Sequence, residues 1–138
     1  MAFENLDSAF ADLEALARQL PDQARQLQRL ISLNILTGAV SNTPVDTGRL
    51  KGGWFTTVGK PSQSRNLRPR RLDKDGASTI GDGQRVILSV PIYDVLFIVN
   101  NVEYVLFIEN GTDKIAPVGM LGNSIRRVLG SLQAQGFG

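Results

Sequence analysis

The chain has 138 residues, of which 42% are hydrophobic and 20% are charged, so we expect one soluble domain over residues 1–138 and not a disordered protein. It contains no histidine and no cysteine, which excludes disulfides, thiol and imidazole catalysis and the usual zinc sites, and we expect neither a metal nor a cofactor. The formal net charge is only +2, so the position of the charges matters more than their sum.

Helical periodicity dominates the first part of the chain. Apolar residues recur every three or four positions from Phe3 to Leu20, which predicts a first amphipathic helix. Pro21 breaks or kinks it, and a second helix is expected from Asp22 to Ser41, although Gly38 weakens its last turns. The buried face of the second helix is predicted to comprise Leu27, Leu30, Ile31, Ile35, Leu36 and Val40.

The hydropathy pattern gives no sign of a membrane segment. No apolar run approaches the roughly 18 residues that a spanning helix needs. The first ten residues carry acidic side chains where a cleavable signal peptide carries Lys or Arg. We therefore expect no contact with a membrane.

Three short strands are expected after the helix stop signal at Thr43–Pro44. The segments Phe55–Val58, Arg85–Val90 and Ile92–Val99 are rich in β-branched and aromatic residues, and the first two alternate as half-buried strands do. Their order along the chain predicts a small antiparallel sheet.

Residues 59–84 are predicted to form a long basic loop, because Ser, Arg, Pro, Asp and Gly dominate and apolar residues are few. Its basic side chains are Lys60, Arg65, Arg68, Arg70, Arg71 and Lys74. They are suited to contact DNA phosphates or an acidic protein surface. We favour an assembly element that becomes ordered on a partner, so that a subunit without residues 61–76 would still fold.

Two further helices are expected in the last part of the chain. Asn100 or Asn101 would cap a short helix over residues 102–110, which Gly111 would end in the left-handed conformation. A last helix is predicted from Val118 to Gln133. Its inward face would comprise Met120 or Leu121, Ile125, Val128, Leu129 and Leu132.

These elements predict an α+β fold. A long N-terminal helix, kinked or folded as a hairpin, and a C-terminal helix would pack on the small antiparallel β-sheet.

No catalytic constellation is found in the sequence. A Ser-His-Asp triad is impossible without histidine, and no Gly-rich loop is followed by Lys-Ser or Lys-Thr. Glu103 and Glu109 are six residues apart, which in a helix places them on different faces, so they are poor candidates for a catalytic pair. We expect that the protein is not an enzyme.

Two segments are more distinctive than the rest. The first signature segment is Thr43–Leu50, with the sequence Thr-Pro-Val-Asp-Thr-Gly-Arg-Leu, and Trp54 follows it. The second signature segment runs from Asn100 to Met120 and includes Ile-Glu-Asn-Gly-Thr at residues 108–112. In this order and spacing they resemble the tail-completion or neck proteins of long-tailed double-stranded DNA bacteriophages, where Pro-Val-Asp-Thr-Gly-x-Leu precedes Tyr-Ala-x-x-x-Glu-x-Gly-Thr. The residues that carry the resemblance are Pro44, Asp46, Thr47, Gly48, Arg49, Leu50, Trp54, Tyr104, Glu109, Gly111, Thr112 and Pro117.

The resemblance implies a structural virion protein that is made in the host cytoplasm and forms a homo-hexameric ring in the phage neck. The ring would complete the tail and join it to the head-tail connector and to the tail terminator or tube proteins, while DNA passes through its lumen. One alternative is a head-tail adaptor, stopper or tail terminator subunit. An alternative of another class is a small DNA-binding protein that uses the basic loop.

The signature residues also carry structural expectations. Asp46 or Thr47 would cap a turn over residues 48–52 by accepting a backbone N–H, and Gly48 would let the chain bend tightly. Arg49 would form a bidentate ion pair with Glu109 and so join the two signature segments.

Overall fold

The computed structural model describes residues 21–91 and 94–135. The predicted helix from Phe3 to Leu20 and the break at its end lie outside these described residues. The observed elements are α2 (Pro21–Ser41), the 3-10 helix η1 (Lys51–Gly53), β1 (Trp54–Val58), α3 (Ala77–Ser89), β2 (Leu96–Asn100), α4 (Val105–Asn110) and α5 (Met120–Ala134). The α+β class is confirmed, because helices pack on a two-stranded antiparallel sheet, but the C-terminal helix α5 packs chiefly on α2.

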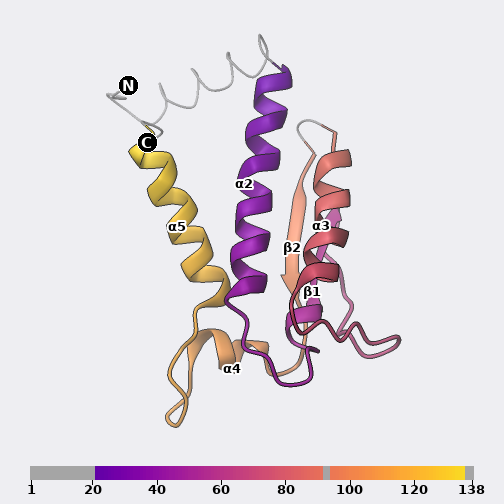
Figure 1. The fold of residues 1–138 in the computed structure, drawn as a ribbon, viewed down its shortest axis with the longest axis vertical. Coiled ribbons are helices and arrows are strands. Elements are labelled where there is room, and N and C mark those ends of the chain that lie inside the picture. The colour runs from indigo at the N-terminus through magenta and orange to yellow at the C-terminus, as the bar shows by residue number, and fades with distance from the viewer. Residues whose placement is uncertain (1–20, 92–93, 136–138) are drawn as a thin grey trace.

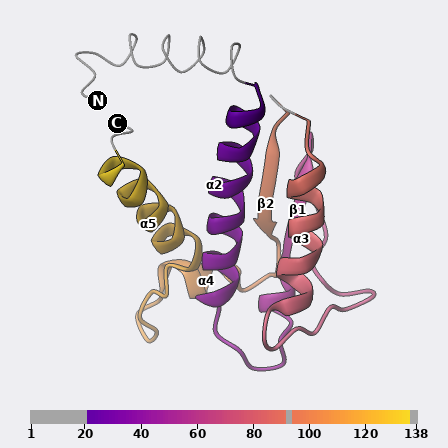
Figure 2. The same cartoon turned by 45° about the horizontal axis from the view of Figure 1, so that its top comes forward.

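Helix α2 occupies the middle of the molecule, with α5 on one side and α3 and the sheet on the other (Figure 1). The turned view in Figure 2 shows the same order. The strands pair with Trp54 opposite Asn100 and Val58 opposite Leu96. Helix α4 lies near the end of α2 and leads through a loop into α5 (Figure 1). Both signature segments are therefore at the same end of the molecule.

The core lies where α2, α3, the sheet and the start of α5 meet. Its buried members are Leu36, Ala39, Val40, Leu50, Trp54, Ile87, Val102 and Met120. The Trp54 indole N–H donates to Thr43 Oγ1 at 2.8 Å, and the Thr43 hydroxyl donates to the Ala39 carbonyl at 2.7 Å. The only tryptophan is thus linked through the Thr43 hydroxyl to the last turn of α2, and its polar atom is not left unsatisfied on burial.

Gly38 explains why α2 and α5 approach each other closely. A Cβ at Gly38 would overlap the Ser124 side chain, and the Ser124 hydroxyl donates to the Ile35 carbonyl at 2.8 Å. The glycine that weakens α2 by about 1 kcal/mol relative to alanine is therefore the residue that allows this crossing. From there toward Pro21 the two helices diverge (Figures 1 and 2).

The predicted strand Arg85–Val90 is wrong, because residues 77–89 form α3. Thr79, Gly83 and Ile87, spaced by four residues, are the buried positions of this helix, whereas Leu88 is 50% exposed. The cause lies before the helix. The buried Asp73 carboxylate accepts the Gly76 and Thr79 N–H groups and the Thr79 hydroxyl, which fixes the first turn as a helix.

This helix changes two other predictions. The sheet has two strands in the part of the chain that the structure describes. The basic segment between β1 and α3 spans residues 59–76, since residues 77–84 are helical. We call residues 59–76 the basic loop from here on.

Three more local predictions are corrected. Ile125 and Leu129 of α5 are 37% and 53% exposed, and the buried positions of this helix are Met120, Ser124 and Val128. Neither Asn100 nor Asn101 caps α4, because that helix begins only at Val105. Strand β2 begins at Leu96 and not at residue 92.

The end of α4 follows the prediction in part. Gly111 has φ 76°, the positive value that was expected, but its ψ of 174° is extended, so the chain leaves the helix without a left-handed helical turn. Among the residues that the structure describes, no helix has the length and hydropathy to cross a membrane.

Candidate functional site

The first signature segment forms a tight turn around Gly48. Gly48 has φ 90°, and its carbonyl accepts the N–H groups of Gly52 and Asp73 at 2.9 and 3.1 Å. The Thr47 hydroxyl oxygen accepts the Arg49 N–H at 3.2 Å, while the Asp46 side chain is exposed. The predicted tight bend at Gly48 is thus confirmed, and Thr47 is the residue that accepts the backbone N–H.

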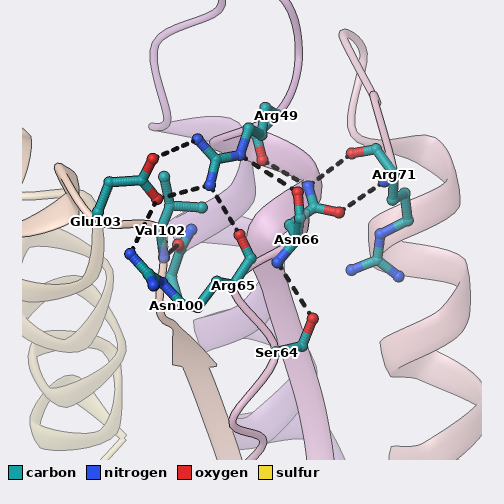
Figure 3. A network of polar contacts seen from close by, with 8 residues as sticks. All are labelled: Arg49, Ser64, Arg65, Asn66, Arg71, Asn100, Val102 and Glu103. Carbon is teal, nitrogen blue, oxygen red and sulfur yellow. Dashed lines mark hydrogen bonds and ion pairs between the residues drawn. The ribbon is translucent and has the colours of Figure 1, made fainter. Parts of the chain in front are cut away.

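Arg49 joins the two signature segments, but through a different carboxylate from the one predicted. Its guanidinium makes a bidentate pair with Glu103, at 2.8 and 2.6 Å (Figure 3). The predicted pair with Glu109 is wrong. The Arg49 side chain is only 10% exposed and lies over the Tyr104 ring, whereas that of Glu103 is 46% exposed. One face of the guanidinium is therefore desolvated while its partner remains in contact with water.

Glu109 has a different task. Its two carboxylate oxygens accept the N–H groups of Leu121 and Gly122, both at 3.0 Å, at the start of α5. The N-cap residue Gly119 has no side chain that could do this. A carboxylate at a helix N-terminus satisfies free N–H groups and interacts favourably with the helix dipole. Glu109 therefore fixes α4 onto α5.

Asn66 of the basic loop connects the Arg49 pair to the rest of the loop (Figure 3). Its Nδ2 donates to the carbonyls of Arg49 and Arg71, both at 2.8 Å, and its Oδ1 accepts the Arg71 N–H at 2.6 Å. Arg49 in turn donates to the carbonyls of Arg65 and Asn66. Asn66 is 1% exposed and has φ 54°, a conformation that asparagine tolerates better than most residues.

Arg71 is the one basic residue of the basic loop whose side chain is mostly buried and bonded within the subunit. Its guanidinium donates to the carbonyls of Gly52 and Trp54, pairs with Asp82 at 2.7 Å, and lies 4.4 Å from the centre of the Phe55 ring. The other basic side chains of the loop are exposed: Lys60, Arg65, Arg68, Arg70 and Lys74.

The basic loop therefore differs from the expected element that orders only on a partner. Asn66, Arg71 and Asp73 hold it against the turn at Gly48 and the start of α3. A subunit without residues 61–76 would lack Asn66, Arg71 and Asp73. These contacts therefore speak against the expectation that this shortened subunit still folds.

The first signature segment also meets α4 around a small pocket of about 150 Å³. Its lining is Pro44, Val45, Asp46, Thr47, Gly48, Leu50, Tyr104 and Ile108. Six of the predicted residues are thus brought together here. The pocket is mainly apolar, and its one carboxylate, Asp46, is exposed to solvent.

Gly111, Thr112 and Pro117 lie in the loop between α4 and α5. The Thr112 N–H donates to the Ile115 carbonyl at 2.8 Å, and the Thr112 hydroxyl oxygen accepts the N–H groups of Lys114 and Ile115. A Cβ at Gly111 would come within 2.7 Å of the Pro117 nitrogen. These residues therefore shape a turn.

No family model, curated protein or solved structure matches the chain. Among residues 21–91 and 94–135, no three His, Cys, Asp or Glu side chains are grouped closely enough to hold a metal ion. Arg49, Glu103, Glu109 and Asn66 are all engaged in intramolecular hydrogen bonds. These side chains thus hold the two signature segments, the basic loop and the start of α5 together.

Sequence reasoning missed the central residues of this site. Asn66 lies in a stretch of low hydropathy, and the only local signal was that asparagine is frequent in turns and at positive φ. The sequence carries no local signal that Glu103 is the partner of Arg49. Thr43 next to Pro44 predicts a helix stop, but nothing in the sequence indicates that its hydroxyl accepts the Trp54 N–H.

The Arg49 side chain also controls the titration of its partner. Its hydrogen bonds to Glu103 lower the pKa of that carboxyl to about 2, from 4.5 in a free side chain. In Asp73, burial raises the pKa, but the hydrogen bonds from Thr79 and Gly76 outweigh it and the pKa is lowered overall. Both carboxylates are thus stabilised in their charged forms.

We expect the contribution of Glu103 to stability to depend on pH. A carboxyl group whose pKa is lower in the folded state stabilises the fold above its unfolded pKa and loses this effect as pH falls. The gain from the Arg49–Glu103 pair should therefore be complete above about pH 5 and disappear as the pH falls toward about 2. Urea midpoints of the wild type and Glu103→Gln, measured from pH 7 to pH 2, should converge at the acidic end; a constant difference would contradict the pair.

Proposed function

We propose that this chain is a structural subunit of the neck of a tailed bacteriophage, of the tail-completion type, which acts as one copy in a homo-hexameric ring. The order and spacing of the two signature segments support the family. The hydrogen bonds of their charged residues support a scaffold role, because the bonds of Arg49 and Glu109 join different elements of the subunit. In this role the protein works by shape, through contacts with its own copies and with the rings above and below.

The observation that carries the proposal is an apolar surface on and beside α4. Leu106 and Phe107 are 67% and 59% exposed, and Ile115 in the following loop is 47% exposed. Val105 and Ile108 of the same helix pack against the core, so α4 presents apolar side chains to both the interior and the solvent. Exposed large apolar side chains that are close together mark surfaces for protein partners. A ring of identical subunits would cover such a surface by head-to-tail contacts.

Replacing Phe107 by glutamate should leave a folded subunit that no longer enters the particle. A charge buried against an apolar partner surface is expected to lower affinity at least about tenfold, which corresponds to about 1.4 kcal/mol. The measurement is the copy number of the protein in purified particles, by quantitative mass spectrometry, together with imaging of joined heads and tails. Leu88→Glu is the matched control, since Leu88 is 50% exposed on α3 and outside this surface.

The expected wild-type result is a hexameric complement in each particle and few joined particles with Phe107→Glu. A dodecameric complement would indicate an adaptor ring instead. Particles that lack the protein altogether, or equal incorporation of both glutamate variants, would contradict the proposal.

A second candidate, a small DNA-binding protein, rests on the exposed cations of the basic loop. Arg65, Arg68 and Arg70 line an open concave surface together with polar Gln63 and Ser64. Phosphate contacts of this kind give affinity that falls steeply with salt. Salt-dependent retention of duplex DNA that is lost in Arg68→Ala/Arg70→Ala would favour this candidate, since neither side chain is part of the internal network.

A further inference from the structure

Helices α2 and α5 leave a groove between them that is lined by both apolar and polar side chains, the polar ones being Asn34, Arg127, Ser131 and Gln135. Beyond their crossing at Gly38 they diverge, and the space between them has a volume of about 280 Å³. Its apolar lining is Leu27, Leu30 and Ile31 of α2 with Val128 and Leu132 of α5. The prediction that Leu30 is buried is wrong, since it is 56% exposed on the apolar face of α2. A face of this kind requires a cover.

We propose that the groove binds the N-terminal segment of the same copy, with residues 3–16 folded back as a helix against α2 and α5 and residues 17–20 forming the reversal. The segment has the pattern that such a groove takes, with apolar residues at helical spacing along one face. These residues are Phe3, Leu6, Phe10, Leu13 and Leu16. This inference does not depend on the neck function.

The charges of the two partners are complementary. Residues 3–20 contain four acidic residues and one basic residue. Helices α2 and α5 together contain Arg25, Arg29, Arg126 and Arg127 but only one acidic residue, Asp22. Arg127 lines the groove itself. An acidic amphipathic helix would therefore meet two helices of net positive charge, with Arg127 at the groove itself, which favours this segment over a neutral or basic occupant.

The covalent link between the N-terminal segment and α2 favours docking of the segment in the groove of its own copy. Leu20 is bonded directly to Pro21, and Leu27 lies about 9 Å further along α2 at 1.5 Å per residue. A reversal over about four residues, as in αα-hairpins, at 17–20 would place Phe10 beside Leu27 and Leu6 beside Ile31. A tethered segment that reaches its site has an effective concentration in the millimolar range. The segment of a neighbouring copy competes poorly with it.

The absence of cysteine allows a direct test, because two introduced cysteines form the only possible disulfide. The full chain carrying Phe10→Cys and Leu27→Cys should form an intramolecular disulfide under mild oxidation, seen as a monomer on a non-reducing gel and assigned by mass spectrometry. Leu6→Cys with Ile31→Cys provides a second pair with the same expected result. The matched control is Phe10→Cys with Leu88→Cys, since Leu88 is exposed on α3 and is not part of the groove.

The expected result is that the groove pairs close at least about tenfold faster than the control pair, as a preformed contact requires. Equal rates for all three pairs would show that the segment is not docked in the groove. Disulfides that join two copies in the groove pairs would show that a neighbouring copy supplies the segment. Either of these two results overturns the proposal, and neither bears on whether the protein belongs to a phage neck.

Discussion

Replacing Asn66 by alanine is expected to destabilise the protein by about 3–4 kcal/mol, because the buried groups left unsatisfied each cost about 1–3 kcal/mol and a positive φ adds strain. The asparagine side chain makes three hydrogen bonds, two to backbone carbonyls and one to a backbone N–H, with 1% of its surface exposed. Alanine offers none of these and adopts φ 54° only with strain. The free energy of unfolding from urea denaturation measures the effect.

Two further substitutions separate the causes. Asn66→Gly removes the side-chain hydrogen bonds but accepts the positive φ, so it should be more stable than Asn66→Ala by about 1 kcal/mol. Ser64→Ala removes a hydroxyl oxygen that accepts the Asn66 N–H at an exposed position and should cost less than about 1 kcal/mol. If Asn66→Ala cost no more than Ser64→Ala, the network around Arg49 would not stabilise the fold.

Replacing Gly83 by alanine is expected to destabilise the protein by about 2 kcal/mol, because overpacking a tight core costs more than the helix propensity gained. A Cβ at Gly83 would overlap the Leu36 side chain and come within 2.8 Å of Thr56 Oγ1. Leu36 is fully buried in the core, so it has no free space into which to move. Thermal and urea unfolding should both report the loss.

Gly81 supplies the matched control, because it lies in the same helix two residues earlier and a Cβ there would meet no atom within 4 Å. Gly81→Ala should therefore stabilise the protein by about 1 kcal/mol through helix propensity alone. The two alanine variants thus have opposite expected signs. If both were stabilising, α3 would not pack on α2 as described.

The elements that could be predicted from the sequence are those with a strong local pattern. The apolar face of α2 shows the helical period, and the residues around Phe55 alternate as a strand does, so both were placed within a residue or two. The last helix was also found. Its inward face was misjudged because Ile125 and Leu129 are apolar but exposed, and sequence periodicity cannot tell a core face from a partner face.

The failures come from contacts between residues far apart in the chain. Residues 85–90 have β-branched and aliphatic side chains, but the start of their helix is fixed by hydrogen bonds that the Asp73 carboxylate accepts, and hydropathy periodicity does not reveal these bonds. Both Glu103 and Glu109 could pair with Arg49 as far as the sequence shows, and which of them does so depends on where α4 begins. Asn66 owes its role to a fold of the loop that its composition does not encode in any regular pattern.

The placement of Arg71 has a consequence for how copies of this protein meet. Strand β1 has β2 on one side, and on its other side the Trp54 carbonyl, which an incoming strand would use, is already occupied by the Arg71 guanidinium. An arginine in this position protects an open sheet edge, as charged side chains do where aggregation must be prevented. At high concentration, free subunits would therefore resist adding a strand of one copy to the open edge of β1 in another copy.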